Sequence, residues 1–352
     1  MSIINSLVRE HLLALTPYSS AREEYSGKEG VFLDANENPY GSVAGRGLNR
    51  YPDPYQRKVK HKLAELKEVY PEQIFLGNGS DEAIDLIIKA VCEPKVDNMV
   101  VLPPTYGMYQ VCADIQQIET RKSNLKSNFQ LDLEDIAKNV DAQTKIIWVC
   151  SPNNPSGNLI HASDIEVLLD TYADCLIIID EAYIDFATQP SFIGKLTTYD
   201  NLVVLQTFSK AWGMAGLRVG MAFGHVDLIK ILNKIKYPYN LNQESQKLTL
   251  EALNNVWKKD AYVEKILKAR FRLFKRLIAL ENVRNIYPSD SNQLLVKFTD
   301  ANLVFSYLID RKIIVRNRSN VTLCDDCLRI SVGTAKENRA LMEELKGFLV
   351  NT

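Results

Sequence analysis

The chain has 352 residues, of which 46% are hydrophobic and 24% are charged, and its formal net charge is −1 at pH 7. This size allows a large buried core and predicts roughly two domains. Because nucleic acids and anionic membranes usually require a basic protein surface, the near-neutral charge argues against both as the main partner. A small-molecule ligand is expected instead.

The N-terminal segment, MSIINSLVREHLLALTPY, has apolar residues at helical spacing and predicts an amphipathic helix. Arg9, Glu10 and His11 interrupt its apolar run, and the basic start and cleavage site of a secretion signal are missing. No apolar run in the sequence approaches the ~20 residues that a membrane span needs. We therefore expect a cytoplasmic protein.

The six cysteines agree with a reducing compartment, because four of them lie in or beside apolar segments, as small buried hydrophobes do: Cys92, Cys112, Cys150 and Cys175. Cys324 and Cys327, in CDDC, have the spacing of a metal or redox pair. A zinc site needs two further ligands at compatible spacing, and the sequence offers no second pair. No metal is expected.

Short apolar runs alternate with helical stretches between about residues 74 and 224. This alternation predicts an α/β fold with a mainly parallel sheet covered by helices on both faces. The predicted strands are 73–76, 98–102, 145–150, 175–180, 201–206 and 219–224. In such a sheet the carboxyl ends of the strands meet at one edge, where ligands bind.

After about residue 240 the pattern changes to long charged helices and then to the strand-like runs NQLLVKF, KIIVR and CLRISVG. This pattern predicts a second, smaller α+β domain, joined to the first near the proline-rich YPYN of residues 237–240. We expect the N-terminal helix to pack on this domain. The predicted boundaries are 30–240 for the large domain, and 1–29 with 241–352 for the small domain.

Several loops at the predicted strand ends carry polar residues. In LGNGSDEAIDL, the backbone N–H groups of Gly79, Ser80 and Asp81 lie at a helix N-terminus, a position that binds phosphate. The same turn lacks the third glycine of a dinucleotide fingerprint. Asp180 ends a strand that is apolar enough to be buried, so its carboxylate should face a cation or a proton donor, although it could also cap a helix. Asn154, in CSPNNPSG, could donate to a ligand oxygen or stabilise a turn.

Lys210 follows the strand 201–206 in TFSKAWGMAGLRVG. A lone lysine there is usually a solvated loop residue, but Thr207, Ser209 and Arg218 lie close to it in the sequence and could bind an anion. A phosphate site, a buried carboxylate, an amide donor and a lysine together match pyridoxal 5′-phosphate. The lysine would form a Schiff base, the aspartate would keep the pyridine nitrogen protonated, and the anion site would hold the phosphate.

The ordered series of these motifs resembles the fold-type I, aspartate aminotransferase-like pyridoxal-phosphate enzymes and, within them, the histidinol-phosphate aminotransferases. Over nearly the full length the series is LTPYSSAR, LDANENPYGS, NRYPDP, LGNGSDEAIDL, PTYGMY, CSPNNPSG, IIDEAYIDF, TFSKAWGMAGLRVG and CLRISVGT. Any one segment could occur by chance, but the ordered series is specific. The resemblance implies a three-layer large domain, a smaller α+β domain and an aminotransferase of histidine biosynthesis that uses histidinol phosphate and 2-oxoglutarate or glutamate.

The resemblance also implies roles for the cofactor contacts. Lys210 would bind the cofactor covalently and move protons, and Asp180 would contact the pyridine nitrogen. Asn154 and Tyr183 would bind the phenolic oxygen, and Tyr106 would stack on the ring. The implied phosphate ligands are Thr207, Ser209, Arg218 and the backbone of Ser80 and Asp81. Tyr51, in NRYPDP, would reach the cofactor phosphate of the neighbouring subunit, which implies a homodimer.

For the substrate, the resemblance implies that Arg329, in CLRISVGT, binds the anionic group and that domain closure completes the site. Arg316 and Arg318, in VRNRSN, compete for a second anion contact, and the spacing to Arg329 favours Arg316. The further implied substrate contacts are Tyr18, Arg22, Asn36 and Asn38. Alternatives of the same fold are a threonine-phosphate decarboxylase and an aromatic amino-acid aminotransferase. A pyridoxal-phosphate-sensing regulator would need a DNA-binding domain, for which the chain leaves no room before Ser80.

Overall fold

The computed structural model describes residues 3–18, 30–45 and 47–351. Its largest element is a seven-stranded sheet in the order β1-β7-β6-β5-β4-β2-β3. The strands are β1 (Ile74–Asn78), β2 (Asn98–Val101), β3 (Glu119–Lys122), β4 (Thr144–Cys150), β5 (Leu176–Asp180), β6 (Leu202–Thr207) and β7 (Val219–Gly224). The pairs from β6 to β3 are parallel, whereas β7 pairs antiparallel with β1 and β6. The predicted, mainly parallel sheet is confirmed.

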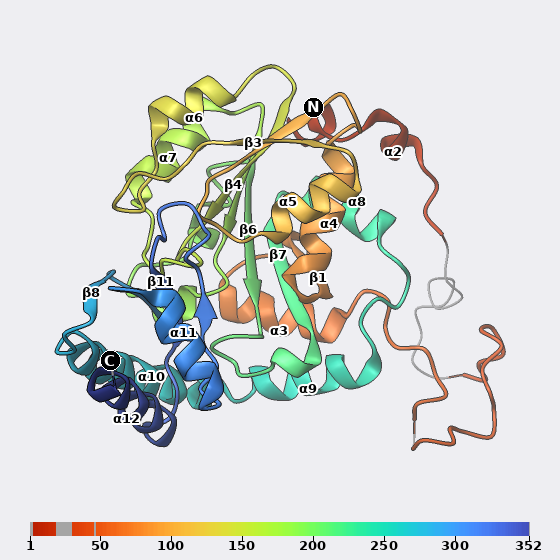
Figure 1. Cartoon of the computed structure of the whole chain (residues 1–352). Coiled ribbons are helices and arrows are strands. Elements are labelled where there is room, and N and C mark those ends of the chain that lie inside the picture. The colour runs from red at the N-terminus through yellow and green to blue at the C-terminus, as the bar shows by residue number, and fades with distance from the viewer. Residues whose placement is uncertain (1–2, 19–29, 46, 352) are drawn as a thin grey trace.

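Helices cover both faces of this sheet and give three layers, as the fold prediction required (Figure 1). Alternate residues of a strand point to opposite faces, so each central strand feeds two cores. In β5, Ile177 and Ile179 pack in one core, and Leu176 and Ile178 pack in the other. The first core includes residues of α3 (Arg57–Lys67), α6 (Leu133–Asn139) and α7 (Ala162–Thr171), and the second includes residues of α4 (Gly79–Val91), α5 (Met108–Ile115) and α8 (Val226–Ile235).

The edge strand β3 was missed from the sequence. Its residues, ETRK, are exposed or half-buried, and the strand pairs only with β2. An edge strand with this exposure needs no apolar run, so the signal that identified the central strands is absent here.

The N-terminal segment forms two short helices, α1 (Ile3–Leu7) and α2 (Glu10–Ala14), rather than one. The chain turns at Arg9, whose backbone N–H donates to Ala90 O and whose guanidinium pairs with Glu93 at 2.7 Å. Ile4, Leu7, Val8 and Leu12 are buried in the core that lies under α4 and α8. Contrary to our expectation, this segment therefore packs on the large domain and not on the small one.

The small domain has its own antiparallel sheet in the order β10-β11-β9-β8. Its strands are β8 (Val283–Ile286), β9 (Gln293–Phe298), β10 (Arg316–Asn317) and β11 (Cys327–Ser331). Helices α11 (Ala301–Asp310), α12 (Ala335–Asn351) and the end of α10 (Val256–Leu277) pack on it. No helix in the described part of the chain is long and apolar enough to cross a membrane.

The core of this domain draws on residues 273–348, whereas α9 (Gln243–Leu253) contacts α3 of the large domain. The boundary predicted at residues 240 and 241 stays a prediction. Four short 3₁₀ helices complete the described structure: η2 (Pro71–Gln73), η3 (Ile184–Phe186), η4 (Phe192–Lys195) and η5 (Ala215–Leu217).

Two glycines bring the start of α4 against β7. A Cβ on Gly220 would lie 2.1 Å from the backbone nitrogen of Ser80, so only glycine allows this approach. Gly79 has a φ of +74°, and a Cβ there would lie 2.7 Å from Nη2 of Arg218. The helix N-terminus thus lies beside the loop that carries Arg218.

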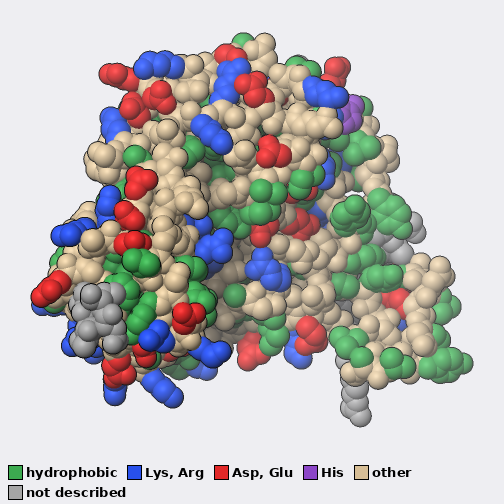
Figure 2. Space-filling model, viewed as in Figure 1, with side chains coloured by type: hydrophobic (Ala, Val, Ile, Leu, Met, Phe, Trp, Pro, Cys, Tyr) green, Lys and Arg blue, Asp and Glu red, His purple; other side chains and the backbone are tan. Residues whose placement is uncertain are grey.

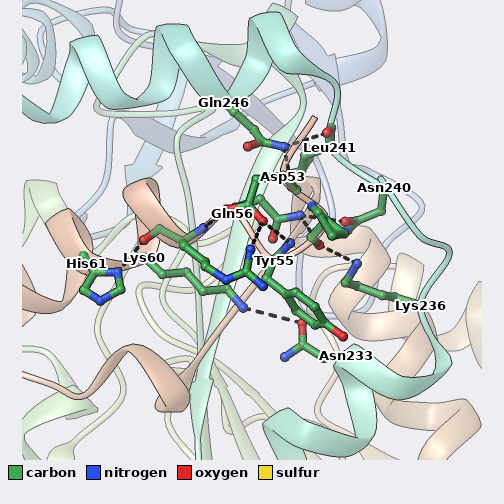
Figure 3. Close-up of polar contacts among 12 residues, drawn as sticks. Asp53, Tyr55, Gln56, Lys60, His61, Asn233, Lys236, Asn240, Leu241 and Gln246 are labelled. Carbon is green, nitrogen blue, oxygen red and sulfur yellow. Dashed lines mark hydrogen bonds and ion pairs between the residues drawn. The ribbon is translucent and has the colours of Figure 1, made fainter. Parts of the chain in front are cut away.

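A polar network fixes residues 53–61 to the junction of α8 and α9 (Figure 3). The side-chain amide of Gln246 donates to the carbonyl of Asp53 at 3.0 Å, and the Lys236 ammonium donates to the carbonyl of Pro54 at 2.9 Å. The residues just before this network, 30–45 and 47–52, extend away from the body of the molecule (Figure 1, orange-red). We call these residues the arm. The network therefore sets the point at which the arm leaves the domain.

Candidate functional site

A cavity of about 760 Å³ lies at the carboxyl ends of the central strands, between the two domains. Figure 2 shows a hollow with Lys and Arg side chains at its rim between these parts of the molecule. Twelve of the predicted site residues line the cavity: Ser80, Asp81, Tyr106, Asn154, Asp180, Tyr183, Thr207, Ser209, Lys210, Arg218, Arg316 and Arg329. Residues from seven separate segments of the chain thus meet in one place.

Lys210 lies three residues beyond the end of β6, and its side chain is open to the cavity. Its Nζ lies 5.5 Å from the centre of the Tyr183 ring. Partial burial, and then the positive charge of Arg329, lower the pKa of Lys210 below its usual value. A lysine with a lowered pKa has a larger fraction of neutral amine near pH 7, which is the form that attacks a carbonyl.

Asp180 is the last residue of β5 and is 3% exposed. The Tyr109 hydroxyl donates to its Oδ2 at 2.6 Å, and the Ala182 N–H donates to its Oδ1 at 3.0 Å. Burial raises the pKa of Asp180, while these two donors oppose that rise. A buried carboxylate held in this way can stabilise a cationic group in the cavity.

The start of α4 and the β6–β7 connection bring several groups that can bind an anion to one side of the cavity. Arg218 approaches Ser209 Oγ at 3.4 Å and pairs with the Asp81 carboxylate at 3.2 Å. Thr207 Oγ1 donates to Ser209 Oγ at 3.0 Å, which orients both hydroxyl groups. The backbone N–H groups of Ser80 and Asp81 at the helix start are further candidate donors for a phosphate, whereas the Gly79 N–H already donates to Arg218 O at 2.9 Å.

Tyr106 and Asn154 also have defined partners at the cavity wall. The Tyr106 hydroxyl donates to Asp81 Oδ1 at 3.0 Å, and burial raises its pKa. Asn154 Oδ1 accepts a hydrogen bond of 2.7 Å from Nη1 of Arg329. This bond joins a loop of the large domain to β11 of the small domain.

Three arginines approach the cavity from the small domain. Arg316 lies opposite Arg329 in the antiparallel β10–β11 pair, and Arg318 lines the cavity beside them. Because both Arg316 and Arg318 reach the cavity, the structure does not decide which of them is the second anion contact. The preference for Arg316 stays a prediction.

Four predicted residues in the described part of the chain are not brought to this cavity in the single chain. Tyr51 stacks on Tyr239, with ring centres 4.5 Å apart, and together with Asn36 it lines a separate cavity of about 480 Å³. Asn38, also on the arm, accepts a hydrogen bond from the backbone N–H of Tyr40. Tyr18 is exposed, and Arg22 lies outside the described residues.

Two residues at or behind the cavity were missed. Tyr109 is fully buried and stacks on Trp148, with ring centres 4.5 Å apart, while its hydroxyl reaches Asp180. Thr105 lines the cavity, and its Oγ1 is buried without a hydrogen bond in the described structure. Both lie in PTYGMY, from which only Tyr106 was selected. That motif was the available signal.

The remaining sequence candidates show no metal chemistry in the described residues, where no group of three His, Cys, Asp or Glu side chains is placed to hold an ion. Cys324 and Cys327 are buried free thiols. Burial raises the pKa of Cys324 to about 12 and that of Cys327 to about 11, so both are poor nucleophiles near neutral pH.

Comparison with known proteins agrees with this geometry. The chain is 49% identical over 345 residues to the histidinol-phosphate aminotransferase of Cytophaga hutchinsonii. This alignment covers 98% of the chain and 99% of the relative. The chain is 50% identical over 346 residues to that of Parabacteroides distasonis, with coverage of 98% and 99%.

Among solved structures, histidinol-phosphate aminotransferase from Sinorhizobium meliloti in complex with pyridoxal-5′-phosphate matches with a TM-score of 0.79, at 22% identity over 89% of this chain and 90% of that one. L-threonine-O-3-phosphate decarboxylase from Porphyromonas gingivalis matches with a TM-score of 0.71, at 23% identity over 86% and 91%. At these identities the two structures establish the fold alone, and they share it although their reactions differ.

The family model described as aminotransferase class I and II matches residues 25–345. This family depends on pyridoxal phosphate, in agreement with the resemblance seen in the motifs. A match over most of the chain, together with relatives about half identical over almost their entire length, shows that the chain belongs to the class I and II aminotransferases.

Proposed function

We propose that this enzyme transfers an amino group between L-histidinol phosphate and 2-oxoglutarate, giving imidazole acetol phosphate and glutamate, in histidine biosynthesis. The observation that carries the proposal is a cavity with two groups of anion-binding residues, one at Arg218 and one at the arginines of β10–β11, that also contains Lys210. The identity of about one half to histidinol-phosphate aminotransferases supports it. We place the enzyme in the cytoplasm, because its free buried cysteines fit a reducing compartment.

The residues of the cavity fit pyridoxal 5′-phosphate as the cofactor. The anion site beside Arg218 fits its phosphate, Asp180 fits a protonated pyridine nitrogen, and Lys210 fits its aldehyde. When bound, this cofactor supplies an electron sink for cleavage of a bond next to the substrate nitrogen. Tyr106, Tyr183 and Asn154 line the same cavity. The Tyr106 ring would stack on the flat cofactor ring, and the Tyr183 hydroxyl and Asn154 would contact its phenolic oxygen.

Lys210 then has two tasks. Its amine holds the cofactor until substrate arrives and afterwards moves a proton to and from the substrate carbon. The lowered pKa suits both tasks, because a group that exchanges protons works best when its pKa lies near the working pH. Burial raises the pKa of Tyr183 to about 12, so its hydroxyl remains a donor throughout.

Histidinol phosphate differs from the substrates of most transaminases because a phosphate stands near the position of the α-carboxylate. Arg329 can bind either anion, since its planar guanidinium pairs bidentately with carboxylate and with phosphate. Arg316, opposite Arg329 in the strand pair, is our candidate for a second contact with the anion. Glutamate and histidinol phosphate can thus use one site in turn.

A threonine-phosphate decarboxylase is the nearest alternative, because it also requires a phosphate site in this fold. Which bond is broken depends on which bond stands perpendicular to the cofactor ring, and that depends on small differences in substrate position. An aromatic amino-acid aminotransferase is less well supported, because an aromatic amino acid gives the arginines only one carboxylate to bind.

A substrate panel tests the function. Histidinol phosphate, threonine phosphate and phenylalanine are each offered with 2-oxoglutarate, and glutamate and carbon dioxide are measured. We expect a preference for histidinol phosphate of at least about tenfold in kcat/KM, because the extra charged hydrogen bonds to its phosphate contribute about 1.5–3 kcal/mol. Release of carbon dioxide from threonine phosphate, or a preference for phenylalanine, would overturn the assignment.

The cofactor site is tested separately by borohydride reduction of the purified enzyme. The reduced cofactor should be recovered on one peptide, attached to Lys210, because this lysine alone among the described lysines lines the cavity. Lys210→Ala should yield no adduct, whereas Lys258→Ala, on the surface of α10, should yield the same amount as wild type. An adduct on a different lysine would exclude this site.

Tyr109→Phe tests whether the Tyr109 hydroxyl helps to keep the buried Asp180 ionised. Loss of the hydroxyl removes a donor to Asp180, so the pKa of this already raised acid rises further. A smaller fraction of Asp180 is then ionised at pH 7, and we expect about tenfold lower turnover and faster release of the cofactor. Both defects should diminish as the pH increases, because a higher pH restores the carboxylate. Tyr172→Phe, outside the cavity, is the control, and a pH profile of Tyr109→Phe like that of wild type contradicts the role.

We also propose that the enzyme is a homodimer whose arms complete the neighbouring sites. Four large apolar side chains of the arm are almost fully exposed in the single chain: Val31, Leu33, Tyr40 and Val43. An apolar extension of this kind normally packs on a partner. A second copy in contact with the arm could receive Tyr51, Asn36 and Asn38 at its own cavity, with Tyr18 and Arg22 as further candidates.

Mixing two inactive variants tests the shared site. Tyr51→Ala should impair the site of the neighbouring subunit, which would receive the altered arm. Lys210→Ala should inactivate the site of the subunit that carries this substitution. A mixture that exchanges subunits should regain up to about one quarter of the wild-type activity, because random pairing gives half heterodimers with one intact site each. No recovery under proven exchange, or an active species that sediments as a monomer, would rule out shared sites.

A further inference from the structure

Arg318 belongs to the same face of the small sheet as the two arginines already described. Its backbone N–H donates to Cys327 O at 2.9 Å, two residues beyond the point where Arg316 pairs with Arg329. Side chains two residues apart in an extended chain point to the same side. Arg316, Arg318 and Arg329 therefore approach the cavity together, and all three line it.

The positive charge of this group is not balanced by the protein. Among the described residues none of the three guanidinium groups forms an ion pair, and the hydrogen bond from Arg329 goes to the neutral amide of Asn154. The Nε atoms of Arg318 and Arg329 are buried and have no hydrogen-bond partner in the described structure. Burial, then Arg329 and Arg316, lower the pKa of Arg318. An anion from outside the chain would relieve each of these penalties.

The number of arginines indicates the charge of that anion. A carboxylate carries one negative charge, and a single planar guanidinium can bind it bidentately. A phosphate monoester carries about −1.5 to −2 charges at pH 7 and has three strong acceptor oxygens. Arg329 alone is sufficient to bind a carboxylate, whereas a phosphate monoester can accept hydrogen bonds from further guanidinium groups.

The loop that carries Arg318 holds it in place. The Val321 N–H donates to Arg318 O at 2.8 Å, the Cys324 N–H donates to Val321 O at 2.9 Å, and the Cys327 N–H donates to Cys324 O at 3.0 Å. Both cysteine side chains are fully buried. The CDDC motif thus forms a packed turn behind Arg318, and its buried thiols anchor the turn.

We propose that Arg318 is a specificity-determining residue that binds the phosphate of the substrate together with Arg329 and Arg316, and so favours a phosphate monoester over a carboxylate at that end of the substrate. This inference rests on the proposed function, whose substrate it explains. Arg318 is better suited than Arg316 to this discrimination, because Arg316 is exposed to water whereas Nε of Arg318 is buried.

Arg318→Gln, Arg318→Lys and Arg316→Gln test the inference, with Arg272→Gln on the exposed face of α10 as the matched control. The two half-reactions are measured separately, one with histidinol phosphate and one with glutamate, and inorganic phosphate is titrated as an inhibitor of the glutamate half-reaction. Thermal unfolding of each variant shows whether the fold is kept.

We expect Arg318→Gln to lower kcat/KM for histidinol phosphate by about 10- to 100-fold and to weaken inhibition by inorganic phosphate to a similar extent. The loss for glutamate should be at least about fivefold smaller, and Arg318→Lys, which keeps the charge but not the planar fork, should lie between Arg318→Gln and wild type. Arg272→Gln should match wild type in every measurement.

Equal losses for the two substrates, or full retention of the histidinol phosphate half-reaction in Arg318→Gln, would overturn the inference. If Arg318→Gln unfolds, Arg318→Lys tests the inference in its place. A ratio of kcat/KM for histidinol phosphate to kcat/KM for glutamate that equals the wild-type ratio in this variant would exclude phosphate recognition by the planar guanidinium of Arg318. Failure of the proposed function gives a different result: wild type itself would not react with histidinol phosphate. In that case, inhibition of the glutamate half-reaction by inorganic phosphate still tests whether Arg318 binds phosphate.

Discussion

The site depends on one constraint: a carboxyl group is buried at the end of a central strand. Burial of a charged group is unfavourable unless hydrogen bonds and an opposite charge compensate it. Asp180 receives the Tyr109 hydroxyl and the Ala182 N–H, and both donors are fixed by the fold, one on α5 and one just beyond β5. A cation in the cavity would supply the remaining compensation. A protonated heterocycle in that position would be bound and activated by the same interaction.

Much of the fold could be predicted because the central strands are buried on both faces and give continuous apolar runs. The failures have physical causes. The edge strand β3 is polar because one of its sides lacks a partner strand. The N-terminal segment was assigned to the wrong domain because its apolar residues show that it is buried but not against what, and the contact with Ala90 and Glu93 is tertiary.

The site shows the same difference between local sequence patterns, which can be read from the sequence, and tertiary contacts, which cannot. Residues within recognisable motifs, such as Lys210 and Asp180, were found because each motif marks the end of a strand and parallel strand ends converge. Tyr109 was missed because its hydroxyl meets a partner 71 residues away, which no local pattern reveals. Tyr51, Asn36 and Asn38 of the arm were named from a family resemblance, and in the single chain they lie away from this cavity, so their role stays a prediction.

The hydrogen bond between Arg329 and Asn154 has a consequence for the entropy of ligand binding. A free arginine side chain samples many rotamers, and binding an anion normally requires that this freedom be lost. Nη1 of Arg329 is already held at 2.7 Å by Asn154, whereas its buried Nε has no partner in the described structure. The guanidinium plane is therefore oriented before any anion arrives, and less of the anion's binding free energy is consumed in ordering the side chain. If Arg329 binds the substrate anion as proposed, Asn154 in the large domain would orient the side chain of the small domain that recognises it.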